Sequence, residues 1–185
     1  MPISTIGQNG LNAPLSLTSP ALGTPSALVL TNATGLPQAG LGTNVVGNGP
    51  VFSACASGSQ ALTQNTWNKV LFGTEIFDTN SNFASSRFTP TVAGYYQFSA
   101  TINFGSGNPV TDSRVSLYKN GSVYVSGTAI GATNSNGTPF TGLGYANGST
   151  DYFEIYAYTG TASTTLYGDG SGPYTTFQGV LVRSA

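Results

Sequence analysis

The sequence predicts an all-β fold, a sandwich or jelly roll of about ten short strands, and three observations carry this prediction. Gly, Ser, Thr and Asn make up nearly half of the 185 residues, a composition that disfavours helices and favours strands joined by tight turns. Several segments alternate apolar and polar residues with a period of two. Many short strands at regular spacing are typical of β-sandwiches and jelly rolls.

The clearest strand covers residues 95–104, in which apolar residues from Tyr96 to Phe104 alternate with polar residues for ten positions. Residues 114–119 and 122–126 flank Asn120-Gly121 and predict a hairpin. This two-residue loop favours a type I′ turn, in which both residues have positive φ. The other predicted strands are 51–56, 67–72, 83–88, 151–158 and 175–183.

The first 48 residues differ in composition from the rest of the chain. They contain no aromatic residue and no charged one, and the first charge along the chain is Lys69. Five prolines interrupt the segment, and within it residues 27–31 are predicted as a short strand. We therefore divide the chain into an extended N-terminal arm, 1–48, and a folded β domain, 49–185. A chargeless arm is expected to dock through apolar and backbone contacts that salt does not weaken.

The composition argues against several classes of function. Without histidine, no Ser-His-Asp or Cys-His catalytic arrangement can form. Five Lys and Arg residues do not supply a basic surface for nucleic acid, and no apolar run is long enough for a membrane helix. Asp151 and Glu154, three apart on a strand, face opposite sides and do not form a glycosidase pair. We therefore predict a protein that is not an enzyme.

No cofactor is predicted, and calcium is the one ion that the sequence leaves open. Its candidate ligands are the carboxylates of Asp112, Asp151, Glu154 and Asp169, which follow no sequential ligand pattern. Cys55, the one cysteine, is interpreted as a small buried apolar residue.

The segment Phe88-Thr-Pro-Thr-Val-Ala-Gly94-Tyr95-Tyr96-Gln97-Phe98 resembles the signature of the globular head of complement component one-q, a relative of the tumour necrosis factor fold. Three flanking features are also similar to that family. They are the early strands at 67–72 and 76–80, the hairpin at 118–121 and the closing Phe-x-Gly strand at 177–181. The resemblance covers residues 50–185. It implies a ten-stranded jelly roll that assembles as a homotrimer without catalytic activity.

A second, weaker resemblance concerns the arm. Thr31-Asn-Ala-Thr-Gly-Leu-Pro37 is similar to segments that precede trimeric tip domains in bacteriophage tail fibres. The domain is also more similar to bacterial and phage versions of the family than to animal ones, notably at residues 87–96. These resemblances imply a virion protein.

Two sets of residues are candidates for interactions. We expect the tyrosine-rich face of residues 152–158 to be covered by a neighbouring subunit, because exposed aromatic side chains are costly. The trimer-interface candidates are Tyr96, Phe98, Tyr152, Tyr156 and Tyr158, and for Tyr96 and Phe98 a position in the core remains the alternative. The candidates for anchoring the arm are Leu28, Val29, Leu30 and Leu36.

The leading hypothesis is a non-enzymatic structural protein of a bacteriophage virion. It would be a homotrimeric capsid decoration or cement protein, or a short head or tail fibre, whose arm binds capsid or tail proteins. The alternative is a receptor-binding tip that recognises host cell-surface glycans through loops at 134–144 and 168–173, which are rich in Asn, Ser, Gly and aromatic residues. Low surface charge leaves a further alternative, a secreted protein or a protein of a harsh environment.

Overall fold

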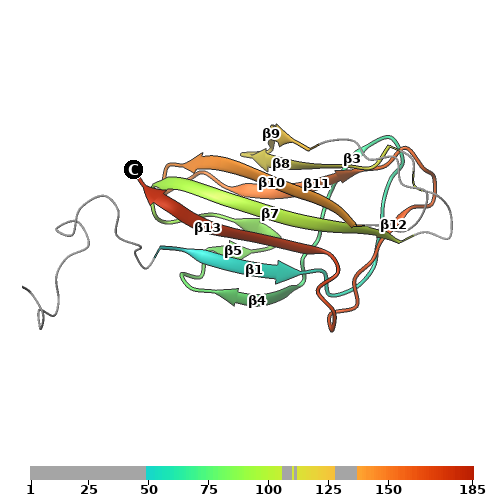
Figure 1. Ribbon diagram of the computed structural model, residues 1–185, viewed down its shortest axis with the longest axis horizontal. Coiled ribbons are helices and arrows are strands. Elements are labelled where there is room, and N and C mark those ends of the chain that lie inside the picture. Colours follow the sequence, from blue (N-terminus) through green and yellow to red (C-terminus); the bar gives the residue numbers. More distant parts are fainter. Residues whose placement is uncertain (1–48, 106–109, 111, 128–136) are drawn as a thin grey trace, which may run out of the picture. The chain divides into compact units, whose positions relative to one another are not determined.

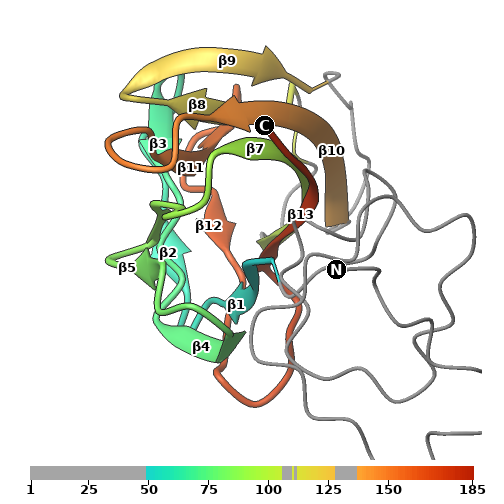
Figure 2. The same cartoon turned by 90° about the vertical axis from the view of Figure 1, so that its left-hand side faces the viewer.

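The computed structural model describes residues 49–105, 110, 112–127 and 137–185. The predicted arm, with its strand at 27–31 and its anchoring candidates, lies outside these residues. Every regular element in the described part of the chain is a β-strand, and two antiparallel sheets pack face to face (Figures 1 and 2). The all-β jelly-roll prediction is therefore confirmed.

The larger sheet contains the long strands of the fold. Its order is β2-β12-β7-β13-β1-β4, and β10 also pairs with β7 along residues 94–103. Its strands are β1 (Val51–Cys55), β2 (Gln60–Ala61), β4 (Thr74–Asp78), β7 (Gly94–Gly105), β10 (Gly137–Ala146), β12 (Thr165–Leu166) and β13 (Thr176–Ser184).

The smaller sheet lies on the other side of the core. Its order is β5-β6-β11-β8-β9, and β3 also pairs with β11. Its strands are β3 (Trp67–Lys69), β5 (Phe83–Ala84), β6 (Arg87–Phe88), β8 (Arg114–Lys119), β9 (Ser122–Ser126) and β11 (Phe153–Tyr158).

Phenylalanine rings fill the space between the two sheets. Phe98 from the larger sheet contacts Phe153 from the smaller one, with ring centroids 4.5 Å apart. Phe52 of β1 also contacts a ring of the smaller sheet, since it stacks on Phe88 of β6 with ring centroids 4.3 Å apart. All four rings are buried. Burying each ring contributes about 1.5–3 kcal/mol, so these inter-sheet pairs are a main source of the fold's stability.

The Phe-x-Gly motif of the closing strand has a steric explanation. Gly179 on β13 lies between Phe52 on one neighbouring strand and Phe98 on the other. A Cβ atom at this position would lie 2.6 Å from a ring carbon of Phe52 and 2.8 Å from one of Phe98. The two rings occupy the space that a side chain would need, so this position requires glycine.

The predicted hairpin is confirmed. Asn120 and Gly121 have φ values of 53° and 78°, as a type I′ turn requires. The Asn120 side chain also donates a hydrogen bond to Asp151 Oδ1 (2.8 Å) and accepts one from the Tyr152 backbone N–H (3.0 Å). The turn is thereby attached to the residues that lead into β11.

Two predictions about local structure are corrected. Residues 137–144, predicted as part of a loop, belong to strand β10, and residues 134–136 lie outside the described residues. Pro139 is tolerated because, among the described residues, β10 pairs with β7 alone and its other side is a sheet edge. The predicted strand 83–88 is divided into β5 and β6 by Ser85 and Ser86, which both have positive φ.

The strand register defines two ends of the domain. At the proximal end Pro50, the residue before β1, lies beside Leu181 in the last part of β13, and the Leu181 N–H donates to the Pro50 carbonyl (3.0 Å). At the distal end Cys55 pairs with Thr176, and the segment between β12 and β13 connects the strands. In Figure 1 the C-terminus marks the proximal end at the left, and the distal end is at the right.

Candidate interaction surfaces

The outer side of the larger sheet carries a group of exposed apolar side chains. Strand β7 alternates strictly, so Tyr96 faces the core and Tyr95 faces out. Tyr95 pairs with Tyr145 of β10, and their rings lie 5.4 Å apart. We call this group the apolar face; it consists of Tyr95, Leu143, Tyr145, Val180 and Val182.

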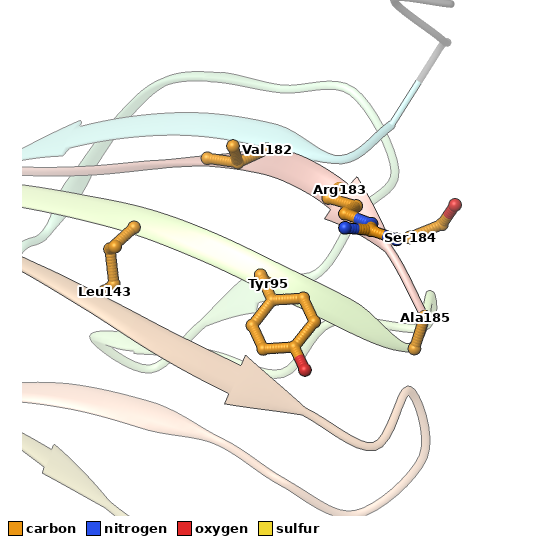
Figure 3. Close-up of a pocket in the computed structure, with 6 residues that line it drawn as sticks. All are labelled: Tyr95, Leu143, Val182, Arg183, Ser184 and Ala185. Carbon is orange, nitrogen blue, oxygen red and sulfur yellow. The ribbon is translucent and has the colours of Figure 1, made fainter. Parts of the chain in front are cut away.

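Two aliphatic side chains of the apolar face are exposed over more than half of their surface. Leu143 is 62% exposed and Val182 is 58% exposed. The face borders an open hollow of about 540 Å³ between β10 and the end of β13. Tyr95, Leu143 and Val182 line it together with residues 183–185 (Figure 3). The exposed Gln97 lies between Leu143 and Val180 in this register. A group of exposed apolar side chains of this kind on a sheet is a candidate interaction surface.

Two of the predicted trimer-interface residues, Tyr96 and Phe98, lie inside the core. Both are completely buried within a single chain, so neither offers surface to a neighbouring subunit. The Tyr96 hydroxyl donates to the Val92 carbonyl (2.7 Å), and burial raises the pKa of Tyr96 to about 12. For these two residues the structure corrects the interface assignment in favour of the core alternative.

The other three candidates lie together on the smaller sheet, as their spacing predicted. Each is half-buried beneath side chains of its own chain. Tyr156 stacks on Tyr118 with ring centroids 3.9 Å apart, and Tyr158 contacts Trp67 at 5.6 Å. The guanidinium of Arg87 lies 3.8 Å above the ring of Tyr152. Contacts within the chain therefore already cover much of this face.

The charges near the smaller sheet are paired internally. The Glu154 carboxylate is buried and accepts hydrogen bonds from Lys69 Nζ (2.7 Å) and Arg87 Nε (2.9 Å). Asp151 pairs with Lys119 at 2.8 Å, and this bond is the main reason why the pKa of Asp151 is lowered. Glu154 and Asp151 are buried, so removing their cationic partners would leave an uncompensated charge inside the domain.

The four carboxylates considered for calcium do not form a site. Asp112 is bound by Arg114, and Asp169 accepts backbone N–H groups of its own loop. Within the described ranges, no three Asp, Glu or Cys side chains approach one another closely enough to hold a metal ion. Those ranges also contain no helix that could cross a membrane.

Sequence reasoning missed the apolar face because it treated the outward side of residues 95–104 as polar. The signal was present in Tyr95 and in the alternation Leu143-Gly-Tyr145. Three glycines and Pro139 concealed the second of these. Two of the glycines are needed for packing, since a Cβ on Gly144 would lie 2.8 Å from the Phe153 ring and one on Gly142 would lie 2.8 Å from the Phe140 ring.

No known protein family matches the sequence, and no curated protein matches it either. Several solved structures resemble the fold. The globular domain of zebrafish complement 1qA protein has a TM-score of 0.50 and 20% sequence identity, over 75% of this chain and 100% of that chain. Murine APRIL at pH 8.5 has a TM-score of 0.52 and 12% identity, over 72% of this chain and 98% of that chain.

A vertex protein also has a similar fold. The PRD1 vertex protein P5 has a TM-score of 0.51 and 13% identity, over 74% of this chain and 99% of that chain. These similarities show that the domain has the jelly-roll fold of the complement one-q and tumour necrosis factor class. The fold inferred from the signature at 88–98 is thereby confirmed.

Proposed function

We propose that the protein is a non-enzymatic, homotrimeric structural protein of a bacteriophage virion, a capsid decoration or cement protein or a short fibre. The observation that carries this proposal is the apolar face on the larger sheet. Five exposed apolar side chains on adjacent strands are best stabilised by burial against other copies of the chain. The family resemblance of the sequence implies the same homotrimer.

The virion assignment rests on two further observations. The PRD1 vertex protein has a similar fold, and the arm at 1–48 is neutral and resembles segments of tail fibres. We propose that the arm binds capsid or tail proteins through Leu28, Val29, Leu30 and Leu36, and that the domain projects from the particle.

The trimer is tested by placing a charge on the apolar face. Val182→Glu introduces a carboxylate into the proposed contact, where burying its charge is costly, so we expect this variant to be monomeric. Val123→Glu on β9 of the other sheet is the matched control, because Val123 is 50% exposed and Val182 is 58% exposed. Sedimentation of the full-length chains measures the mass, and circular dichroism verifies the fold. A monomeric parent protein, or a trimeric Val182→Glu variant, would refute the proposal.

The role of the arm is tested by deleting residues 1–48. We expect the truncated protein to remain a folded trimer and to be absent from assembled particles. In the full-length protein, moderate NaCl should not release the arm, because it contains no charge that salt could screen. Normal incorporation of the truncated protein would contradict the anchoring role.

A further inference from the structure

The segment that joins β12 to β13 places two tyrosines at the distal end of the domain. Tyr167 and Tyr174 are 39% and 50% exposed. Their rings meet edge to face, with centroids 5.0 Å apart and planes at 72°. The edge of one ring is therefore directed at the other, and both rings present surface to solvent. The register of β1 and β13 puts this segment at the end opposite Pro50.

A carboxylate lies between the two rings in the sequence. Asp169 Oδ1 accepts the backbone N–H groups of Ser171 (2.9 Å) and Gly172 (2.7 Å). Those bonds lower the pKa of Asp169, so the group is ionised at neutral pH. The Tyr167 hydroxyl lies 3.5 Å from its second oxygen, the Ser171 side chain also hydrogen-bonds the carboxylate, and the Asp169 side chain is exposed. Oδ2 can therefore accept hydrogen bonds from a ligand.

The segment is hydrogen-bonded to the strands beneath it. The Tyr167 N–H donates to the Asn103 carbonyl (2.8 Å), and the Thr175 hydroxyl donates to the Tyr167 carbonyl (2.7 Å). A Cβ on Gly168 would lie 2.6 Å from Ala56, so the backbone rests directly on the end of β1. A ligand that binds this surface would therefore lose little free energy in ordering the loop.

The segment has polar neighbours, and Asp169 has no cationic partner among the described residues. Exposed Ser57 and Ser59 lie beside the segment, and Ser59 Oγ donates to the Gly168 carbonyl (3.5 Å). Within the described residues, the ion pairs formed by Lys and Arg involve other carboxylates than Asp169. An anionic ligand would therefore meet an uncompensated negative charge here.

We propose that this surface, formed by Tyr167, Asp169 and Tyr174, binds a neutral sugar. A pyranose ring has a face of C–H groups and a rim of hydroxyl groups. The C–H face fits the electron-rich face of an exposed tyrosine, and a hydroxyl on the rim can donate to the second oxygen of Asp169. This inference goes beyond the structural role proposed above and does not depend on the trimer.

The same geometry sets the specificity of the site. Neutral hexoses and N-acetylhexosamines carry hydroxyl donors without charge, so they suit an ionised carboxylate. Sialic and uronic acids carry their own carboxylate, and repulsion from Asp169 disfavours them. A neutral sugar should therefore bind more tightly than an acidic one.

The experiment uses the full-length protein and saturation-transfer NMR. The probes are the methyl glycosides of glucose, galactose, mannose and N-acetylglucosamine, with N-acetylneuraminic acid as the acidic comparison, each at up to about 50 mM, the range for weak monovalent binding. We expect at least one neutral probe to bind and the acidic probe to bind at least about tenfold more weakly, a difference of about 1.4 kcal/mol.

Two variants locate the site. Tyr174→Ala removes the more exposed ring, and Asp169→Asn keeps Oδ1 as an acceptor for the loop while replacing Oδ2 by a donor. Each should weaken binding at least about tenfold. Tyr124→Ala on β9 is the matched control, because Tyr124 is 44% exposed and lies in the other sheet; it should bind normally.

Three results would overturn the inference. They are the failure of every neutral probe to bind, equal binding of the acidic probe, and unchanged binding by both Tyr174→Ala and Asp169→Asn. The Val182→Glu variant separates this question from the trimer. A monomer that still binds the sugar would support the site independently of assembly, and a trimer that binds no probe would refute the site while leaving the structural role intact.

Discussion

Replacing Gly179 by alanine tests whether the closing strand needs glycine for steric reasons. The added Cβ would lie 2.6 Å from Phe52 Cε1 and 2.8 Å from Phe98 Cδ1. Carbon atoms in contact lie about 3.5–4.0 Å apart, so each ring has to retreat by about 1 Å. Both rings are buried, and each is already packed against a phenylalanine of the smaller sheet. The strain therefore cannot be relieved by moving a side chain into solvent.

The magnitude follows from two opposing effects. Overpacking a well-packed core costs about 1–3 kcal/mol, whereas alanine is favoured over glycine in a strand by about 0.5–1 kcal/mol. We expect a net loss of about 1–2 kcal/mol in the free energy of unfolding. With a typical dependence on urea, this lowers the unfolding midpoint by about 0.5–1 M.

The measurement is urea unfolding of the full-length protein, followed by the fluorescence of Trp67. Gly58→Ala is the control, because a Cβ there meets nothing within 4 Å. Phe52→Leu provides a second comparison, since a smaller side chain at position 52 should reduce the cost of Gly179→Ala in a double-mutant cycle. The steric explanation is wrong if Gly179→Ala is as stable as Gly58→Ala.

Three predictions concern titratable groups. The protein should lose stability between pH 10 and 12, because tyrosine has a pKa near 10 in the unfolded chain and Tyr96 has a pKa of about 12 in the fold. Tyr96→Phe should remove this part of the loss, which urea midpoints at pH 9 and 11 measure. Lys119 lowers the pKa of Asp151, so the ionised carboxylate stabilises the fold at pH 7 and this stabilisation is lost below about pH 4. Asp151→Asn should therefore be less stable than the parent protein at pH 7 and should lose less stability on acidification, which urea midpoints at pH 7 and 3 measure. Asp169→Asn should lower the raised pKa of Tyr167, measured by NMR titration of ¹³C-labelled tyrosine.

Much of the fold could be predicted because local rules and packing agree in the relevant segments. Strict alternation located β7, and the Asn120-Gly121 pair, which favours positive φ at both positions, located the hairpin between β8 and β9. Strand β10 was missed because Pro139 and its glycines are typical of loops. Pro139 is compatible with a strand because β10 lies at a sheet edge. Gly142 and Gly144 are compatible with it because aromatic rings occupy the space that their side chains would need.

The candidate surfaces were harder to predict than the strands. Alternation separates two faces of a strand, but it does not say which face a second sheet covers. Tyr95 and Tyr96 are neighbours of the same residue type, yet one is 51% exposed and the other is fully buried. The tyrosines of β11 depend on partners from distant segments, such as Trp67 and Arg87, whose positions follow from the sheet order.

The hydrogen bond between the Leu181 N–H and the Pro50 carbonyl has a consequence for the connectivity of the chain. Pro50 at the start of the β domain lies beside Leu181 near its end, so a short linker from Ala185 to Gly49 would join the two ends. The chain could then be reopened between Ser171 and Gly172, in the exposed segment at the distal end. Such a circular permutant would keep every strand pairing described above, with its new termini at the opposite end of the domain.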